Sequence, residues 1–453
     1  MHFLIIGGGF VGTALACELL KQAPAGSSIT LANSGGPLGK GLAYGTQSPL
    51  HLLNVPAARM SWTDEQPDDF VNWLAGQGNT CDGAAFVPRQ RYGDYLAVRL
   101  REHIAARPDV HWQQLQDRID SLAPEAGRWI AQCAHGPALT ADRVLLALGN
   151  FAPACPHPSL HALPADRYVG DPWQPDALSG LPADAPVALI GTGLTMLDLL
   201  ISLQALGHHG PVLAISRRGL LPKPHRENEL PPPQWQAPAG WLAAGSLRSQ
   251  LREVRQAIGR AQANGQDWRD VWVALRPRTT ALWHRLDERA RAQFLRHLLP
   301  FWDVHRHRAA PQALAVLRAA QAQGRVQAAA GRLLGARVDA DGLVALQWRA
   351  RGGQDTQEFK AARVFNCTGP STRLAEGRRG LFGHLLHDGR LRPCPLGLGL
   401  EVGAGYALAD AEGREQPGLF YVGPMLRSQH WEATAVPELR AHAKAAARAA
   451  LGC

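Results

Sequence analysis

The chain has 453 residues, 46% of them hydrophobic, and a formal net charge of +9. That length is sufficient for two or three domains with cores of their own. The sequence has neither a run of 18 apolar residues nor a basic stretch before an apolar core, so we expect no membrane span and no secretion. The positive charge comes from 42 Arg and only five Lys, without a Lys/Arg block or nucleic-acid motif, so we expect no nucleic-acid partner.

The seven cysteines form no C-x-x-C pair. This spacing argues against a zinc site and against a dithiol redox centre. It favours a reducing compartment, and we expect a cytoplasmic protein.

The first predicted element is a buried strand that leads into a glycine turn and a helix. Residues 3–6 are all apolar, which is typical of a parallel strand buried on both faces. Gly7, Gly9 and Gly12 then form G-x-G-x-x-G, in which the glycines allow a sharp turn, close approach to a pyrophosphate and tight helix packing. The helix that follows would direct its free N–H groups at the phosphates. This context predicts a dinucleotide site.

The second predicted strand ends at Asn33, where an acid usually holds the adenosine ribose. Asn can still bind a hydroxyl, but without charge assistance. Residues 36–62 form a loop that contains Gly41 and Asn54, at the place where a flavin's pyrophosphate and ring would lie. A simple covering loop is the alternative. The segment at residues 86–96 is predicted to open a helix that reaches about residue 106, and Arg89 in it belongs either to a site or to a surface ion cluster.

The same order of elements then recurs. Short strands from about residue 115 end in a buried strand at 142–150, and a second buried strand leads into Gly191, Gly193 and Thr195. A second meander starts near Ala336 and ends in a strand that leads to Gly369. This internal duplication predicts an α/β fold with two Rossmann-like dinucleotide-binding domains, each with a β-meander, plus a helical insertion. Two nucleotide sites are typical of a flavoprotein reduced by a nicotinamide, so FAD and NAD(P)H are the expected cofactors.

The predicted boundaries place the FAD domain at residues 1–153 and 370–453 and the NAD(P) domain at 154–369. After the next strand of the second unit, Arg217 and Arg218 stand where a ribose acid would sit. Arginine there favours the 2′-phosphate of NADPH. Two solvated arginines are the alternative, and NADH would then remain usable.

The helical insertion is expected at about 226–310. It opens with a proline arm at 230–233, and 13 Arg against six Asp/Glu lie between residues 248 and 308. It ends with an H-x-H pair that includes His305 and Arg306, and because no carboxylate or thiol cluster accompanies the pair we predict no metal site. We expect this basic, aromatic segment to border an anionic substrate or the nicotinamide phosphates, with plain solvated surface as the alternative. An apolar stripe at i+4 spacing needs a neighbour to cover it: Leu282, Leu286, Ala290, Phe294 and Leu298.

The last part of the chain returns to the first domain. A buried strand ends at Gly423 and Pro424, and a helix follows from Thr434 to Leu451 with Pro437 in its first turn. In two-nucleotide flavoproteins the N-terminus of such a helix faces the flavin pyrimidine and stabilises the reduced ring. Pro424 replaces the acid that commonly holds the ribityl chain.

Several blocks together resemble the FAD/NAD(P)-binding flavoproteins that include the FAD-dependent urate hydroxylases. They are G-G-G-F-V-G, G-L-A-Y-G-T, H-L-L-N-V-P, G-T-G-L-T-M-L-D, S-R-R-G, W-D-V-H-R-H-R, N-C-T-G-P and W-E-A-T-A-V-P-E-L-R. The nitrosuccinate-forming aspartate N-monooxygenases look like longer relatives. Asn33 is the clearest departure from the family pattern.

The resemblance implies a monooxygenase in which NAD(P)H reduces FAD and one oxygen atom of O₂ reaches an electron-rich substrate. A small anionic substrate would need basic residues near the flavin, and Arg59, Arg89, His305 and Arg306 are the candidates. Urate, hydroxylated to 5-hydroxyisourate in purine degradation, is the leading substrate. N-hydroxylation of an aspartate-like amino acid is the first alternative, and a flavin-dependent reductase or redox sensor is the second. The oligomeric state stays open.

Overall fold

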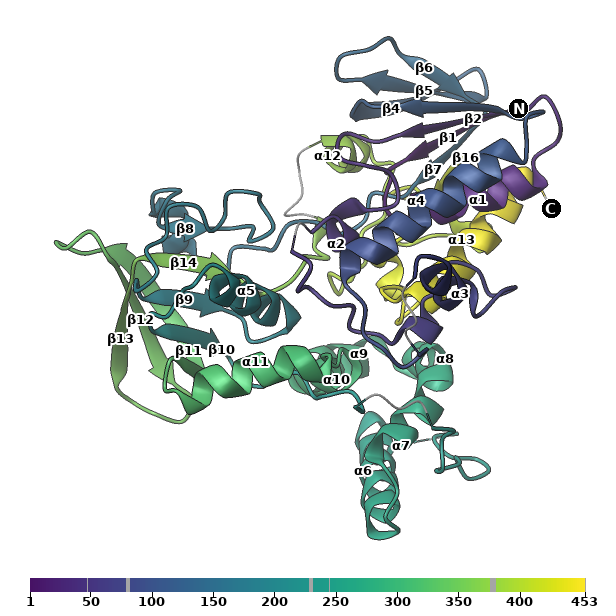
Figure 1. The fold of residues 1–453 in the computed structure, drawn as a ribbon. Coiled ribbons are helices and arrows are strands. Elements are labelled where there is room, and N and C mark those ends of the chain that lie inside the picture. The colour runs from purple at the N-terminus through teal and green to yellow at the C-terminus, as the bar shows by residue number, and fades with distance from the viewer. Residues whose placement is uncertain (47, 79–81, 228–230, 244, 375–379, 453) are drawn as a thin grey trace.

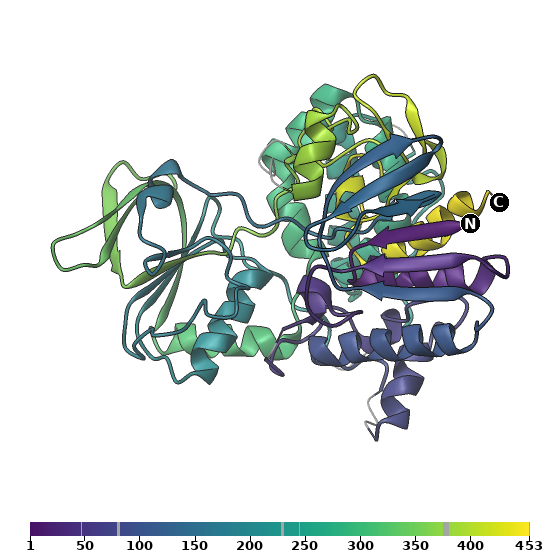
Figure 2. The same cartoon turned by 90° about the horizontal axis from the view of Figure 1, so that it is seen from above.

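The computed structural model describes residues 1–46, 48–78, 82–227, 231–243, 245–374 and 380–452. The chain folds into two lobes, each built around its own sheet, and a helical insertion extends away from both (Figure 1). Seen from above, the two lobes lie side by side (Figure 2). Leu230 of the predicted proline arm and two of the cysteines, Cys81 and Cys453, lie outside the described residues.

The first lobe is built on six strands: β1 (His2–Ile6), β2 (Ser28–Ala32), β3 (His111–Leu115), β7 (Arg143–Leu146), β15 (Ala407–Ala409) and β16 (Glu415–Tyr421). Their order is β15-β16-β7-β1-β2-β3. Because its apolar residues are buried on both faces, β1 lies inside the sheet and pairs in parallel with β2 and β7. β16 joins β7 in parallel, so the last part of the chain completes the lobe that the first part begins.

Three helices cover one face of this sheet: α1 (Phe10–Gln22), α4 (Arg89–Ala105) and α13 (Val436–Leu451) (Figure 1). α1 contacts both of the others. A small sheet of β4 (Ile119–Glu125), β5 (Arg128–Cys133) and β6 (Leu139–Ala141) lies toward the other side, where α12 (Gly380–His387) packs against β4. This is the predicted meander of the first unit.

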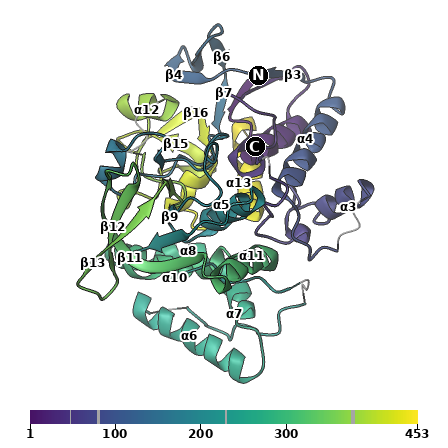
Figure 3. The same ribbon diagram turned by 60° about the vertical axis from the view of Figure 1, so that its left-hand side comes forward.

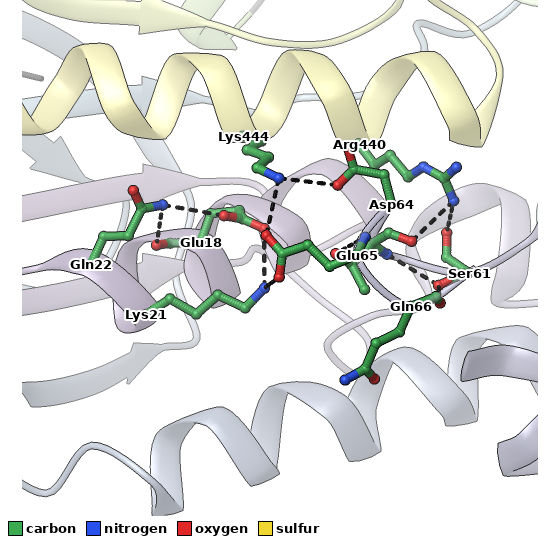
Figure 4. A network of polar contacts seen from close by, with 10 residues as sticks. Glu18, Lys21, Gln22, Ser61, Asp64, Glu65, Gln66, Arg440 and Lys444 are labelled. Atoms are coloured by element: carbon green, nitrogen blue, oxygen red, sulfur yellow. Dashed lines mark hydrogen bonds and ion pairs between the residues drawn. The ribbon is translucent and has the colours of Figure 1, made fainter. Parts of the chain in front are cut away.

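A polar network fastens α13 to α1 and to the loop at residues 61–66 (Figure 4). Lys444 contacts Asp64 and Glu65 at 3.1 and 3.0 Å, and Lys21 reaches Glu65 at 3.1 Å. Arg440 donates to the carbonyl of Ser61 at 2.8 Å. Each exposed ion pair contributes less than about 1 kcal/mol, so the network fixes the position of α13 more than it stabilises the lobe.

The second lobe is built on seven strands: β8 (Tyr168–Val169), β9 (Val187–Ile190), β10 (Val212–Ser216), β11 (Val326–Val338), β12 (Val344–Ala350), β13 (Thr356–Ala361) and β14 (Arg363–Asn366). Their order is β13-β12-β11-β10-β9-β14-β8, and α5 (Leu194–Ala205) and α11 (Pro311–Ala322) pack against each other beside them. β11 pairs in parallel with β10 up to Ala330 and then antiparallel with β12 from Gly331 to Val338, with a bulge between Leu333 and Gly335 inside the antiparallel part. One long strand therefore belongs to both the nucleotide-binding sheet and the meander.

The predicted α/β class with two Rossmann-like units is confirmed, and the strands of the two sheets lie on either side of the proposed boundaries at 153/154 and 369/370. Shorter elements complete the chain: α2 (Gly41–Tyr44), α3 (Asp69–Gly76), η1 (Ala57–Arg59), η2 (Pro158–Ala162), η3 (Arg276–Arg278), η6 (Ala404–Tyr406) and η7 (Pro424–Ser428). None of the helices in the described parts of the chain has the length and apolar character to span a membrane.

The insertion consists of α6 (Leu247–Ala263), α7 (Trp268–Leu275), α8 (Thr279–Arg285), α9 (Glu288–Gln293), the π-helix η4 (Phe294–Leu298) and α10 (Leu299–Arg306). α6 and α7 lie at its far end, away from both sheets (Figure 3). The predicted stripe does not follow one helix, because Leu286 is extended and Asp287 starts α9 by accepting from the N–H of Ala290 at 2.7 Å. α10 contains the His305–Arg306 pair on a helix that leads back to the lobes.

Candidate active site

The first glycine turn has little room for side chains. Gly7 has φ +114°, and a Cβ there would collide with the carbonyl of Ala147. A Cβ on Gly12 would collide with the carbonyl of Gly7, so these two glycines let α1 pack tightly on the sheet. At Gly9 a Cβ would lie 3.6 Å from the Cα of Gly41, so Gly9 and Gly41 bring two backbone segments together where a pyrophosphate would lie.

A groove of about 300 Å³ runs from this turn to the start of α13. Its walls include Gly7–Gly9, residues 40–44 and Gly149, and also Pro424, Thr434 and Leu439 from the last part of the chain. Gly423, with φ +155°, lies directly before Pro424. An elongated, phosphate-containing cofactor such as FAD fits this groove, because the N-terminus of α1 is at one end and that of α13 at the other.

Asn33 lines the groove and also closes the turn that follows β2. Its side-chain oxygen accepts from the N–H of Gly8 at 3.2 Å, and its amide group donates to the carbonyls of Gly35 and Gly36 at 2.8 and 3.0 Å. A carboxylate has no hydrogen to donate to those two carbonyls. These hydrogen bonds explain why position 33 carries an amide and not a carboxylate, which the sequence alone does not reveal.

The second glycine turn has the same geometry. Gly191 has φ +117°, and a Cβ there would collide with the carbonyl of Cys367, as at Gly7. Gly193 faces open space, and Thr195 lies in the first turn of α5. Gly369, with φ +84°, leaves the lobe after β14. These positions are those expected of a second nucleotide site.

Arg217 and Arg218 follow β10 as expected, but their surroundings differ. Arg217 is exposed. Arg218 donates to the carbonyl of Arg296 at 3.3 Å and lies over the ring of Phe301 at 5.1 Å. Arg217 is therefore the freer of the two for a 2′-phosphate, and the assignment stays a prediction.

Six arginines surround a pair of adjoining small cavities of about 70 and 50 Å³ between the insertion and the first lobe. We call this the arginine cavity: Arg59, Arg226, Arg269, Arg276, Arg306 and Arg308. Three lie at 2.6 Å from a carboxylate, in the pairs Arg226–Asp270, Arg276–Glu438 and Arg306–Glu432, and Arg269 lies 3.1 Å from Asp267.

Two members of the arginine cavity have no such partner. Among the described residues, Arg59 and Arg308 make no hydrogen bond or ion pair with a protein acceptor. Burial and then the neighbouring Arg269, Arg306 and Arg59 lower the pKa of Arg308 to about 9, and burial with neighbouring arginines also lowers the pKa of Arg59. Arg59 remains accessible along the cavity although protein surrounds much of it. Arg308 thus retains its charge at neutral pH and attracts an anion.

Further polar atoms at the cavity are buried without a partner in the described structure. They are the donors Arg306 Nη2, Arg308 Nε and Trp272 Nε1 and the acceptor Glu432 Oε1. An unpaired buried polar group costs about 1–3 kcal/mol, so a bound ligand with matching groups would recover that energy. These unpaired groups would bind a ligand that has acceptor oxygens on one part and a hydrogen-bond donor on another.

His225 is a cavity residue that the sequence reasoning missed. Its Nε2–H donates to the carbonyl of Asn54 at 2.9 Å, which joins the second lobe to the loop of the first. Burial and then Arg308 lower the pKa of His225 to about 3, so the ring is neutral at physiological pH. Asn54 therefore lies at the arginine cavity and not in the groove that suits FAD.

The structure brings together only some of the predicted catalytic residues. Arg59 and Arg306 line the arginine cavity, and His305 lies at its edge with its Nδ1–H donating to the carbonyl of Phe301 at 2.7 Å. Arg89 lies elsewhere: it pairs with Asp198 of α5 at 2.9 Å and donates to the carbonyl of Leu52 at 2.9 Å, so it joins the two lobes. Arg308 stands in the same W-D-V-H-R-H-R block as His305, but no sequence spacing links Arg59 to Arg226, Arg269 or Arg276.

Comparison with known proteins agrees with these two units. Residues 4–151 match a sequence family described as FAD-NAD(P)-binding. No curated protein matches the chain by sequence. The folds of several solved flavoproteins nevertheless match almost its whole length.

An L-lysine 6-monooxygenase, an ornithine N-hydroxylase and a disulfide reductase are among the similar structures. The L-lysine 6-monooxygenase of Pseudomonas syringae has a TM-score of 0.65 at 15% identity, over 99% of this chain and 98% of that one. The ornithine N-hydroxylase of Kutzneria sp. 744, in a structure with reduced FAD, NADP⁺ and L-ornithine, has a TM-score of 0.64 at 12% identity, with the same coverage. The bacillithiol disulfide reductase of Staphylococcus aureus scores 0.56 at 10% identity, over 100% of this chain and 98% of that one. At these identities the similarity establishes the fold.

The glycine turns, the groove and the family match support the two expected cofactors, FAD and NAD(P)H. The first lobe provides the groove for FAD, and the second lobe repeats the turn for the nicotinamide nucleotide. The arginine cavity lies between the insertion and the first lobe, and Glu432 in its wall closely precedes Thr434, which lines the groove.

Proposed function

We propose that the protein is an NAD(P)H-dependent flavin monooxygenase that hydroxylates the nitrogen of an amine-bearing carboxylic acid. The balanced reaction is R–NH₂ + O₂ + NAD(P)H + H⁺ → R–NHOH + NAD(P)⁺ + H₂O. Bound FAD supplies the chemistry that takes electrons from the nicotinamide and activates O₂. The chain's own residues bind, orient and shield the substrate.

One observation carries this proposal: the arginine cavity presents unpaired donors beside an unpaired acceptor. Arg59 and Arg308 suit a carboxylate, since guanidinium groups bind carboxylates with two parallel hydrogen bonds. Glu432 Oε1 suits an amino group, and its other oxygen is already held by Arg306 at 2.6 Å. An amino acid has both groups. Aspartate is the simplest candidate with a second carboxylate.

Urate hydroxylation is the second candidate function. The excess of arginine over carboxylate in the cavity suits any small organic anion, including urate. Urate, however, has no cationic amino group to pair with Glu432. Urate hydroxylation is therefore less well supported than hydroxylation of an amino acid.

Reductase chemistry has less support. The cysteines in the described parts of the chain are Cys17, Cys133, Cys155, Cys367 and Cys394, and none lines the groove or the arginine cavity. Burial raises the pKa of the Cys17 and Cys367 thiols, which keeps both protonated and unreactive.

Oxygen uptake and product analysis test the proposal. Purified FAD-loaded protein in air receives NADPH or NADH with aspartate, ornithine, urate or no substrate. An amino acid should accelerate nicotinamide oxidation, with about one hydroxylamine formed per nicotinamide consumed. Stimulation by urate alone, with loss of its ultraviolet absorbance, would transfer the assignment to urate. Nicotinamide oxidation that yields only peroxide with every compound would reject oxygen transfer to this panel.

A further inference from the structure

A second, apolar cavity of about 300 Å³ lies in the helical insertion. Its walls come from α6, α7, α8, the π-helix and α10. Four of the five residues of the apolar stripe noted in the sequence line it: Leu282, Leu286, Phe294 and Leu298. The stripe therefore lines a cavity, although Leu282, Leu286 and Phe294 also pack against neighbouring hydrophobic clusters.

The apolar cavity and the arginine cavity share a wall. Trp272, Trp302 and His305 line both. The ring of Trp272 is 5.1 Å from that of Trp302, and the His305 ring stacks on Trp272 at 5.3 Å and 5°. Burial, with Lys223 and Arg308 nearby, lowers the pKa of His305 and so disfavours a charge on this aromatic wall. One side of the wall is therefore strongly basic and the other apolar.

The two cavities together have the properties of a site for one amphiphilic molecule. Arg59 and Arg308 attract an anionic head, whereas the apolar side offers aromatic and aliphatic surface of a volume usual for small-molecule pockets. The buried N–H of Trp272, which is without a partner in the described residues, lies at the boundary and suits an acceptor oxygen of the head. Aspartate alone would leave the apolar side unfilled.

We infer that the substrate is an amine-bearing carboxylic acid with a large apolar side chain, an alkyl chain or an aromatic ring. Its head contacts Arg59, Arg308 and Glu432, and its side chain passes Trp272 and Trp302 into the apolar cavity. This inference rests on the proposed function for the head group and adds the side-chain class. The wall that the apolar cavity shares with a site for a small anion favours this occupant over a second protein chain.

Equilibrium binding tests the inference without turnover. FAD-loaded protein is titrated by calorimetry, in the absence of NAD(P)H, with glycine, 2-aminohexanoate, 2-aminooctanoate and 2-aminodecanoate. Each buried methylene contributes about 0.8 kcal/mol, so Kd should fall by about tenfold for every two methylenes until the cavity is filled. Octan-1-ol, which has the tail without the head, should bind at least tenfold more weakly than 2-aminooctanoate.

Substitutions on α6 locate the tail. Val254 lines the apolar cavity, and Val254→Trp should fill it and abolish the gain per methylene. Gln256→Trp adds the same bulk to the exposed side of the same helix and should leave the gain intact. Ile258→Phe, at a second position in the lining, provides a smaller change should Val254→Trp not fold. Arg308→Gln should raise Kd for every member of the series by a similar factor, because it weakens the head contact only.

Several outcomes would overturn the inference. They are affinity independent of chain length in the unmodified protein, octan-1-ol binding as tightly as 2-aminooctanoate, or an unchanged gain per methylene in both α6 lining variants. A dimer that Val254→Trp dissociates would assign the cavity to a second copy of the chain. Tight binding of 2-aminodecanoate without oxygen uptake would reject the N-hydroxylation and retain the amphiphile site. Turnover of aspartate, together with affinity that does not depend on the length of an apolar side chain, would retain the N-hydroxylation and reject the amphiphile site.

Discussion

At the scale of single residues, the glycines of the two turns do different work. Gly7, Gly12 and Gly191 are required by the fold, since a Cβ at each would collide with a backbone carbonyl. Gly9 has an ordinary φ of −82° and room for one methyl group, so the fold does not require a glycine there. We expect the glycine to leave space for the pyrophosphate of the cofactor. This makes Gly9 the better probe of cofactor binding.

Replacing Gly9 with Val should abolish FAD binding without unfolding the protein. The branched side chain would occupy the space between Gly9 and Gly41, where the pyrophosphate is expected. The purified variant should be colourless, with far less than one FAD per chain by absorbance. Gly76→Val, at an exposed glycine with free space around it, is the matched control and should remain yellow. Full FAD content in Gly9→Val would exclude this turn from the cofactor site.

Arg59→Gln and Arg308→Gln should each weaken binding of the carboxylate substrate. A hydrogen bond to a charged group is worth about 1.5–3 kcal/mol, which corresponds to a rise of about 10- to 150-fold in KM. Arg308→Gln removes an unpaired buried charge, so the melting temperature of this variant should not fall below that of the unmodified protein. Arg260→Gln, on the exposed side of α6, is the control. An unchanged KM in both cavity variants would remove the arginine cavity from the substrate site.

At the scale of elements, the sequence predicts strands, turns and the duplication well, because each depends on neighbouring residues. Residues 3–6 and 187–190 are buried strands, and each leads into a glycine turn. The arginine cavity could not be predicted in this way. It joins η1, the insertion and the segment before α13, and only the folded chain brings Arg59 beside Arg306. The break at Leu286 was also missed, since an i+4 stripe continues through it unchanged.

The α10 helix provides a pH-dependent stability prediction. Burial raises the pKa of Asp303 to about 6, despite Arg427 at 3.6 Å. A raised carboxyl pKa means that the folded state holds the proton more tightly, so this group's contribution is present below about pH 4 and lost as the pH rises through 6. Asp303→Asn should therefore raise the melting temperature at pH 7.5 and change it little at pH 4. Its side chain is 40% accessible, so the shift will be modest. An equal change at both pH values would show that the ionisation is not responsible.

The turn after β10 should determine the choice of nicotinamide. If Arg217 or Arg218 meets the 2′-phosphate, replacing both with Ala should raise KM for NADPH by about tenfold or more, from the loss of about 1.5–3 kcal/mol. KM for NADH should change little. Single replacements separate the exposed Arg217 from Arg218, which already contacts Arg296 and Phe301. Equal effects on both nucleotides would indicate a structural role, and a preference of the unmodified protein for NADH would contradict the phosphate assignment.

At the scale of the whole molecule, catalysis requires the two lobes to hold their cofactors in register. Arg89 of α4 reaches across to Asp198 of α5, and His51 donates through Nε2 to the carbonyl of Asp198 at 3.0 Å. Arg226 and Arg276 connect the insertion to itself and to α13. The arginine cavity thus exists only while these contacts keep the lobes and the insertion together.

The Arg89–Asp198 pair therefore gives the most direct test of this arrangement. Both side chains are largely buried, so removing one partner leaves an uncompensated charge, at a cost of about 3–5 kcal/mol. Asp198→Leu and Arg89→Met should each lower the melting temperature and slow flavin reduction by NAD(P)H in stopped-flow experiments, with FAD content retained. The double variant should recover part of the stability, because both charges are then absent, but not the rate, because the Arg89–Asp198 link between the lobes is still missing. Lys444→Met, which breaks an exposed pair inside the first lobe, serves as the control and should leave the reduction rate unchanged. Reduction at the normal rate in Asp198→Leu would show that this pair does not set the relative position of the two cofactors.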